Sequence, residues 1–245
     1  MTFTTPPSSA ARHLTPVPST APEPTTAGPA AAESTAAEGH RTTRAGDVRA
    51  FVGAAVQRPS TIGAMAPTGA RVARLLATIT PSTREAVVVE LGAGTGPVSD
   101  AVQDRLRPGS RHLAVELDRD LAEHLRATRP RIDVVQGDAA DLRRLLDAAG
   151  VGAGEVDAVV SALPWTLFDG SQQERILDQI CAVMRPEAAF ATISAHPSSF
   201  FPAAREFRHR LHERFDEIVV SRTVWRNVPP ARVLVCRRPR LRVLP

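Results

Sequence analysis

The chain has 245 residues, 43% of them hydrophobic, and a formal net charge of +4 in which every basic residue is arginine. This composition allows one sizeable core, and the lack of a secretory signal or a membrane-length apolar run argues against a secreted or membrane-spanning protein. The two cysteines, Cys181 and Cys236, lack the spacing of metal ligands or of a disulfide framework, so no metal site is predicted. We expect a cytoplasmic protein, with peripheral attachment to the inner membrane face as a further option.

The first 44 residues differ in composition from the rest of the chain. They are largely Thr, Pro, Ala and Ser, and a segment with so few large apolar side chains cannot offset the entropy of ordering it. We predict a disordered tail over residues 1–44 and one domain over residues 45–245. A targeting segment is the alternative for the tail, but its low arginine content argues against a transit peptide.

Two helices are predicted ahead of the first strand. The first is ended by Pro59 and carries apolar residues at helical spacing, namely Phe51, Val52, Ala55 and Val56. Arg49 and Arg58 accompany them, so this helix is suited to a lipid interface, to a lid over a bound ligand, or to both. The second helix follows Pro67, and its apolar face consists of Val72, Leu75, Leu76 and Ile79.

Short apolar strands then alternate with helical stretches. The five strands are predicted at residues 86–91, 112–117, 132–137, 156–163 and 188–194. This alternation is typical of a parallel sheet covered on both faces. The last two strands, residues 217–225 and 231–238, are joined only by "RNVPP", which is too short for a parallel crossover. The sequence therefore predicts an α/β, doubly wound, Rossmann-like fold with a seven-stranded, mostly parallel sheet and one reversed strand in a C-terminal hairpin.

Three glycines at alternate positions follow the first strand in "VELGAGTG". In a doubly wound sheet this turn lies where ligands bind, so Gly92, Ala93, Gly94 and Gly96 are candidate ligand-binding residues. The spacing GxGxG followed by Pro97 differs from the dinucleotide fingerprint GxGxxG, and no Lys-Ser/Thr pair completes a phosphate loop. A dehydrogenase or a P-loop enzyme is thus less favoured.

Acidic residues stand at the ends of the first three strands. Glu116 lies about twenty residues beyond the glycines, where a carboxylate accepts hydrogen bonds from ribose hydroxyls. Asp138, with the Ala139 amide, could read an adenine edge, and Glu90 could hold a cationic amino-acid group directly or through water. Each acid alone could also be a helix N-cap or a solvated strand-end residue. Together they indicate an adenosine ligand that carries a cation and no phosphate.

These motifs resemble a known family. "VELGAGTG", "AVELDRDL" and "VVQGDA" look like the first three motifs of class I S-adenosylmethionine-dependent methyltransferases, in wording close to rRNA adenine dimethyltransferases and bacterial phospholipid N-methyltransferases. The resemblance covers residues 51–238 and implies S-adenosylmethionine as cofactor. "FVGAAVQRPSTIGAMAPTGARVARLLA" and "RTVWRNVPPARVLVCRR" resemble the N-terminal helical segment and terminal hairpin of the phospholipid enzymes.

The fourth strand ends in "SALPW", where adenine and glutamine N-methyltransferases typically have Asn before a Pro-containing tetrapeptide. Ser161 takes the Asn position, so the carboxamide is missing, and the phospholipid enzymes usually carry a similar Leu-Pro segment without Asn. We therefore place the acceptor chemistry at Ser161, Leu163, Pro164 and Trp165, with Ser161 also beside the cofactor. Trp165 could face the sulfonium through cation–π attraction or simply pack in the core.

The C-terminal part carries most of the basic excess. Arg226 and Arg232 flank a Pro-Pro turn, and at least one is predicted to contact a phosphate headgroup, with structural ion pairing as the alternative. His196, after the fifth strand, is a candidate proton acceptor or an ordinary loop histidine. The positive field would attract an anionic membrane surface or could be a solvated basic face.

The resemblance implies an N-methyltransferase acting on the amine headgroup of a phospholipid, with phosphatidylethanolamine as the expected acceptor. An rRNA adenine or small-molecule N-methyltransferase is the first alternative, and the missing Asn and absent C-terminal helical domain make nucleic acid the less expected partner. An NAD-dependent reductase or an inactive nucleotide-binding module is a second alternative. The chain has no Tyr, which argues against the common Tyr/Lys reductase chemistry.

Overall fold

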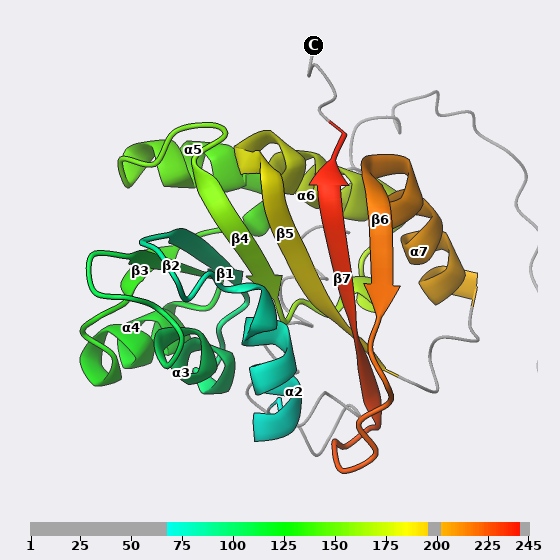
Figure 1. Ribbon diagram of the computed structural model, residues 1–245, viewed down its shortest axis with the longest axis horizontal. Helices are drawn as coiled ribbons and strands as arrows, with labels where there is room; N and C mark the ends of the chain where they lie inside the picture. The colour runs from blue at the N-terminus through cyan, green and yellow to red at the C-terminus, as the bar shows by residue number, and fades with distance from the viewer. Residues whose placement is uncertain (1–67, 196–201, 241–245) are drawn as a thin grey trace, which may run out of the picture. The chain divides into compact units, whose positions relative to one another are not determined.

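The computed structural model describes residues 68–195 and 202–240. The predicted tail, the predicted first helix around residues 51–56 and His196 lie outside these described residues. Within them, the predicted alternation of strands and helices is confirmed (Figure 1).

A single mixed sheet forms the centre of the described chain. Its order is β3-β2-β1-β4-β5-β7-β6, and β7 runs antiparallel to both β5 and β6 while the other neighbours are parallel. The strands are β1 Val87–Leu91, β2 Arg111–Glu116, β3 Asp133–Gln136, β4 Val156–Ser161, β5 Met184–Ala195, β6 Phe215–Val220 and β7 Ala231–Pro239. The seven-stranded sheet with one reversed strand is the one that the sequence predicts.

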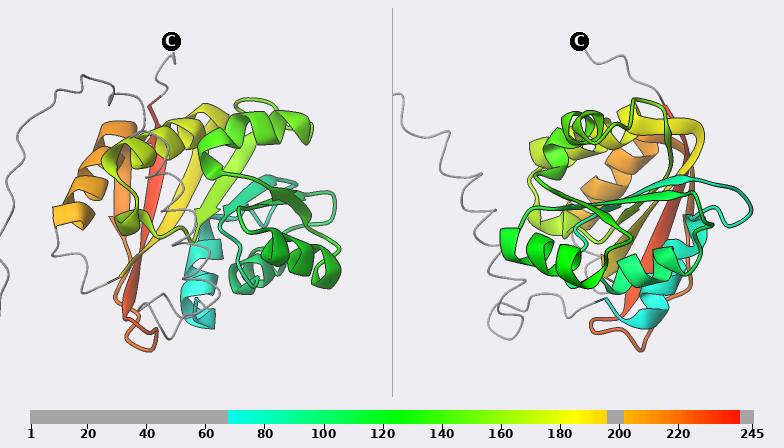
Figure 2. Two further views of the ribbon diagram at one scale, coloured as in Figure 1. Left: turned by 180° about the vertical axis from the view of Figure 1, so that it is seen from behind. Right: turned by 90° about the vertical axis from the view of Figure 1, so that its left-hand side faces the viewer.

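Helices cover both faces of the sheet (Figure 2). Of the described helices, three lie on one face: α2 Ala70–Leu76, α3 Pro97–Gln103 and α4 Arg119–Thr128. Three lie on the other face: α5 Leu142–Ala148, α6 Gly170–Val183 and α7 Pro202–Arg214. Short 3-10 turns complete the elements: η1 Ala77–Ile79, η2 Ala139–Asp141 and η3 Trp165–Leu167.

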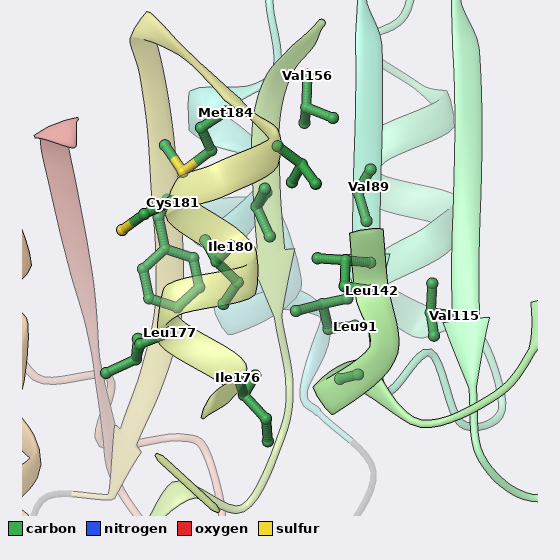
Figure 3. Packing of buried hydrophobic residues seen from close by; sticks show 14 of the residues in the cluster. Val89, Leu91, Val115, Leu142, Val156, Ile176, Leu177, Ile180, Cys181 and Met184 are labelled. Atoms are coloured by element: carbon green, nitrogen blue, oxygen red, sulfur yellow. The ribbon is translucent and has the colours of Figure 1, made fainter. Parts of the chain in front are cut away.

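The larger core lies under α5, α6 and α7. Successive side chains of β1 point to opposite faces of the sheet. Val89 packs in this core and Val88 packs on the other face, as expected for a strand buried on both sides. Ile180 of α6 packs against the sheet in the same cluster as Met184 and Leu142, as Figure 3 shows. The sheet is therefore fixed from both faces, and the residues at its strand ends are held by a rigid frame.

Most strand boundaries differ from the sequence predictions by one or two residues, and the differences in β4, β5 and β6 have visible causes or consequences. β4 ends at Ser161, two residues early, because the chain turns toward Pro164, which cannot donate to a ladder. β6 ends at Val220, so residues 221–230 form a longer loop than predicted. β5 begins earlier than predicted, at Met184, because Met184 pairs with Val156 before the register between β4 and β5 shifts.

In the described ranges, no helix combines the length and the hydropathy that crossing a bilayer would demand.

Candidate cofactor and acceptor site

The turn after β1 needs glycine for two physical reasons. Gly92, Gly94 and Gly96 have φ angles of +73°, +57° and +91°, which L-residues with a side chain rarely adopt. A Cβ atom at Gly96 would also overlap the guanidinium of Arg129, and one at Gly92 would come within 2.9 Å of Leu163 Cδ2. The backbone of this turn is therefore packed closely on two sides.

Gly94 is different, because a Cβ atom there would meet no heavy atom within 4 Å. The middle of the turn thus faces open space, while its backbone nitrogen donates to Glu116 Oε2 at 2.8 Å. Such a bare stretch of backbone beside a carboxylate is suited to a closely approaching ligand. The open space at Gly94 fits the sequence prediction for this residue.

Glu116 ends β2, as predicted, and its side chain lies against the glycine turn. Its side chain accepts hydrogen bonds from the backbone nitrogens of Gly94 and, at 3.0 Å, of Asp118. The residue is only 7% exposed, and this burial raises the pKa of the carboxyl above its ordinary value, although the two N–H groups oppose the shift. The carboxylate keeps further lone pairs with which it could accept hydroxyl hydrogen bonds.

Glu90 lies one residue before the end of β1 and is fully buried. Its Oε2 accepts a hydrogen bond from Ser99 Oγ at 2.7 Å and contacts His112 Nε2 at 3.1 Å. Gln103 Nε2 lies 3.0 Å from His112 Nδ1, and donation by this amide assigns the ring proton to Nε2. The His112 N–H therefore points at Glu90.

The second carboxylate oxygen of Glu90, Oε1, has no hydrogen-bond partner among the described residues. Buried polar atoms are nearly always satisfied, so an orphaned carboxylate oxygen in this position marks a place for a polar ligand atom or a water. The Ser99, Gln103 and His112 contacts were not anticipated from the sequence. A polar residue such as His112 inside the apolar run of β2 is the one signal that could have suggested them.

Asp138 lies two residues beyond the end of β3 and caps η2. Its Oδ1 accepts a hydrogen bond from Ala140 N at 2.9 Å, which is the N-cap role considered from sequence as the alternative. Ala139 is buried in the larger core. A role for Asp138 and Ala139 in reading an adenine edge stays a prediction.

Ser161 ends β4 in a fully buried position. Its hydroxyl oxygen accepts hydrogen bonds from Trp165 Nε1 at 3.2 Å and from Leu163 N at 3.3 Å. These two bonds use both acceptor positions of the oxygen, so the hydroxyl holds the bend after β4 in place.

Trp165 is 2% exposed, and its ring stacks on Phe207 with centroids 4.7 Å apart. Edge contacts with Phe168 and Phe190 surround it further. Packing was the alternative to a cation–π contact with the cofactor when only the sequence was considered, and the geometry favours packing.

The segment after β4 is brought next to the glycine turn. Ala162 N donates to Leu91 O at 3.0 Å, and Leu163 Cδ2 lies 2.9 Å from the position that a Cβ atom on Gly92 would take. Leu163, predicted as part of the acceptor site, therefore adjoins the predicted cofactor turn, and Pro164 follows it in the chain. The predicted cofactor turn and the start of the predicted acceptor segment therefore meet at the carboxyl ends of β1 and β4.

Arg129, which sequence reasoning missed, braces the glycine turn from the end of α4. It forms a bidentate ion pair with Asp100 of α3, at 2.8 and 2.9 Å, and its guanidinium lies over Gly96. The hydrogen bonds from Arg129 hold the pKa of Asp100 below its usual range. No motif spacing links these residues, because the contact joins two helices only in the folded chain.

The predicted headgroup arginines lie near the β6–β7 loop. Arg232 of β7 donates from Nε to Thr223 Oγ1 at 2.8 Å, and Arg226 is exposed in the loop. Neither arginine forms an ion pair with any acid in the described ranges, so the structural ion pairing considered from sequence is not found there. Headgroup contact by either arginine stays a prediction.

Comparison with known proteins identifies the family. The model of the family described as "Methyltransferase domain" matches residues 88–187. The chain is 33% identical over 190 residues to the ornithine lipid N-methyltransferase of Singulisphaera acidiphila, an alignment that covers 76% of this chain and 94% of that protein. This chain belongs to the class I S-adenosylmethionine-dependent methyltransferases.

Two further similarities are consistent with this methyltransferase fold. The ribosomal RNA small subunit methyltransferase A of Anaeromyxobacter dehalogenans is 36% identical over 146 residues, which cover 56% of this chain and 50% of that protein. The O-methyltransferase TomG of Streptomyces achromogenes, solved in complex with S-adenosylmethionine, superposes with a TM-score of 0.56 at 17% identity, covering 78% of this methyltransferase and 89% of TomG. The latter likeness supports the fold.

The site fits S-adenosylmethionine, which this methyltransferase uses as its methyl donor. The open space in front of Gly94 admits a ligand, Glu116 offers carboxylate oxygens for ribose hydroxyls, and Glu90 Oε1 is a buried acceptor without a described partner. A cationic nucleoside without phosphates matches two carboxylates better than a dinucleotide would. A nicotinamide-dependent reductase is therefore no longer a candidate.

Proposed function

We propose that this methyltransferase transfers methyl groups to the amine of a membrane lipid headgroup, with phosphatidylethanolamine and ornithine lipid as the acceptors to test first. The observation that carries this proposal is the similarity to the ornithine lipid N-methyltransferase, which extends over 94% of that protein. The similarity to the ribosomal RNA enzyme extends over only 50% of it. Both lipids offer a primary amine beside an anionic group.

Ser161 supports a lipid amine over a nucleic-acid base. By the family resemblance, adenine N-methyltransferases have an Asn at this position whose carboxamide accepts the hydrogen bond of the amine, and this carboxamide is missing here. In this chain the Ser161 hydroxyl is already engaged by Leu163 N and Trp165 Nε1. The acceptor nitrogen must therefore find its hydrogen-bond partners elsewhere.

When bound, S-adenosylmethionine supplies a sulfonium-activated methyl group for in-line displacement. The chain then needs to align the acceptor and to stabilise its neutral amine, since only the free lone pair can attack. The carbonyl oxygens of Leu163 and Pro164 each accept one bond, from Trp165 N and Leu167 N, and each retains a second lone pair. We assign the acceptance of the amine N–H to carbonyls of this bend.

The anionic part of the headgroup is assigned to arginine. Arg232 uses its Nε for Thr223, which leaves terminal guanidinium N–H groups for a phosphate or carboxylate, and Arg226 adds a second cation in the adjoining loop. The start of β7 pairs with the end of β5, where Ala231 lies opposite Ala195. Arg232 therefore stands at the same sheet edge as the glycine turn.

An acceptor panel tests the proposal. Purified protein is incubated with S-adenosylmethionine and, separately, with vesicles containing phosphatidylethanolamine or ornithine lipid, with small-subunit rRNA and with soluble amines. Phosphatidylcholine vesicles are the matched control, because their headgroup nitrogen is already fully methylated. Mass spectrometry should find added methyl groups on an amine lipid alone. Methylation confined to rRNA or to soluble amines would refute the lipid assignment.

A further inference from the structure

The loop that joins β6 to β7, residues 221–230, presents two large apolar side chains to solvent. Trp225 is 69% exposed and Val228 is 73% exposed, the largest values among the exposed large hydrophobics of the described chain. Single exposed apolar residues are ordinary on protein surfaces. Here, two of them lie within four residues of one loop, so they form a small exposed apolar patch, which we call the apolar tip.

Hydrogen bonds anchor this loop to the rest of the domain. Asn227 Oδ1 accepts from Gly69 N at 3.0 Å, which ties the loop to the start of α2, and Asn227 Nδ2 donates to Pro229 O at 2.7 Å. Val224 forms a bridge with Ala231, the first residue of β7. The apolar tip is therefore displayed by an anchored loop.

The surroundings of the apolar tip are positively charged. Residues 221–232 contain three arginines and no acidic residue, and the arginines are Arg222, Arg226 and Arg232. Arg222 and Arg226 form no ion pair within the described ranges. Tryptophan favours the boundary between headgroups and acyl chains, and arginine favours anionic headgroups. The combination is complementary to the surface of an anionic bilayer.

The loop lies at the edge of the sheet where the site is built. β4 and β5 end there, and Ala195, the last residue of β5, pairs with Ala231. Figure 1 shows the loop projecting beyond the arrowheads of β4 and β5, at the end of the sheet where α2 also lies. A bilayer that receives the loop would bring its headgroups alongside the acceptor edge.

We propose that the loop of residues 221–230 is a docking element that inserts Trp225 and Val228 into the interface of an anionic bilayer. The purpose of docking rests on the proposed lipid acceptor, but docking itself can be measured without turnover. A lipid enzyme needs such an element at its acceptor edge, because the amine is presented by the membrane.

Flotation with phosphatidylglycerol vesicles, which contain no amine acceptor, measures docking alone. The double variant Trp225→Ser/Val228→Ser should bind these vesicles about tenfold or more weakly than the wild type. Val219→Ser is the matched control, because Val219 is 48% exposed on β6 and lies outside the loop. The control should bind like the wild type. Equal binding by the double variant would overturn the proposal.

Tryptophan fluorescence provides the second readout, since the chain has two tryptophans and Trp165 is buried. Vesicles with brominated acyl chains should quench the wild-type emission, and Trp225→Phe should keep vesicle binding but lose that quenching. Undiminished quenching in Trp225→Phe would overturn the proposal. The double variant is also tested for binding to single-stranded RNA. If it loses affinity for RNA and keeps its affinity for vesicles, the proposal is overturned as well.

The two proposals fail in different ways. If the wild-type protein floats with phosphatidylglycerol vesicles but methylates no lipid amine, the docking proposal holds and the proposed lipid function is refuted. Wild-type protein that methylates a detergent-dispersed amine lipid but does not float would keep the function and refute the docking loop.

Discussion

Glu116 Oε2 accepts a hydrogen bond from Gly94 N at 2.8 Å, which ties the carboxylate at the end of β2 to the glycine turn after β1. The same turn adjoins Leu163 after β4. Three strand ends are therefore connected by direct contacts, and the cofactor assignment depends on this arrangement.

Cofactor affinity should depend on the ionisation of Glu116. Burial raises the pKa of this carboxyl, and ribose hydroxyls donate to its ionised form, so S-adenosylmethionine should bind more weakly as pH falls through the raised pKa. Glu116→Gln should bind the cofactor about tenfold or more weakly at neutral pH and should lack this pH dependence. Titration calorimetry over a pH series checks both results. An unchanged affinity in Glu116→Gln would contradict the ribose role.

The same shift has a consequence for stability. Because the folded-state pKa of Glu116 is raised, its contribution to stability is fully present below the unfolded value near 4.5 and is lost as pH rises through the folded pKa. Gln does not ionise, so Glu116→Gln should not lose free energy of unfolding as pH rises. The variant should be at least as stable as the wild type at neutral pH. Urea unfolding at several pH values measures the difference, and a large destabilisation by Glu116→Gln would be inconsistent with a desolvated carboxylate.

Glu90 should act on the amino-acid end of the cofactor. That end is shared by S-adenosylmethionine and S-adenosylhomocysteine, so Glu90→Gln should weaken both by a similar factor, about tenfold or more. The amide oxygen can still accept from Ser99 and His112, which keeps the fold intact. Calorimetry with both ligands is the measurement. Loss of affinity for the sulfonium compound alone would place Glu90 at the methyl group instead.

The Ser161 hydroxyl should prove to be a support for Trp165. Ser161→Ala leaves the buried indole N–H without its acceptor and should lower the free energy of unfolding by about 1 to 3 kcal/mol. In a Trp165→Phe background the same change should cost much less, because no N–H remains to be satisfied. A double-mutant cycle from urea unfolding measures this coupling.

Folded Ser161→Ala protein should also retain most of its kcat. If Ser161→Ala abolished kcat without destabilising the protein, Ser161 would be a catalytic residue after all.

The sequence could predict those features that depend on chain order and periodicity. The glycine turn and Glu116 follow strands that pattern alone identifies, and parallel strands place their carboxyl ends at one edge. Glu90 and Asp138 were also placed near this edge, although each lies slightly off the expected strand end.

Contacts between side chains of distant elements could not be predicted in this way. Arg129 lies over Gly96 because it pairs with Asp100 of α3, and His112 donates to Glu90 because the two strands are in register. Trp165 looked like an available aromatic in sequence, but its burial depends on Phe207 of α7, which only the folded chain brings near. Exposure and pairing follow from tertiary packing and carry no local signal.

Gly94→Asn tests the cofactor position most directly. Asn tolerates the left-handed backbone at φ +57°, so the fold should survive, while its side chain would fill the open space in front of the turn. Gly154→Asn is the matched control. Gly154 has φ +72°, and a Cβ atom there would also meet no heavy atom within 4 Å, but it precedes β4, at the opposite edge of the sheet.

The decisive measurement is calorimetric titration of S-adenosylmethionine into the wild type and these two variants. Gly154→Asn should bind like the wild type, and folded Gly94→Asn should lose affinity by about a hundredfold or more. Wild-type affinity in Gly94→Asn would contradict the account, because the cofactor could not then lie across the turn after β1.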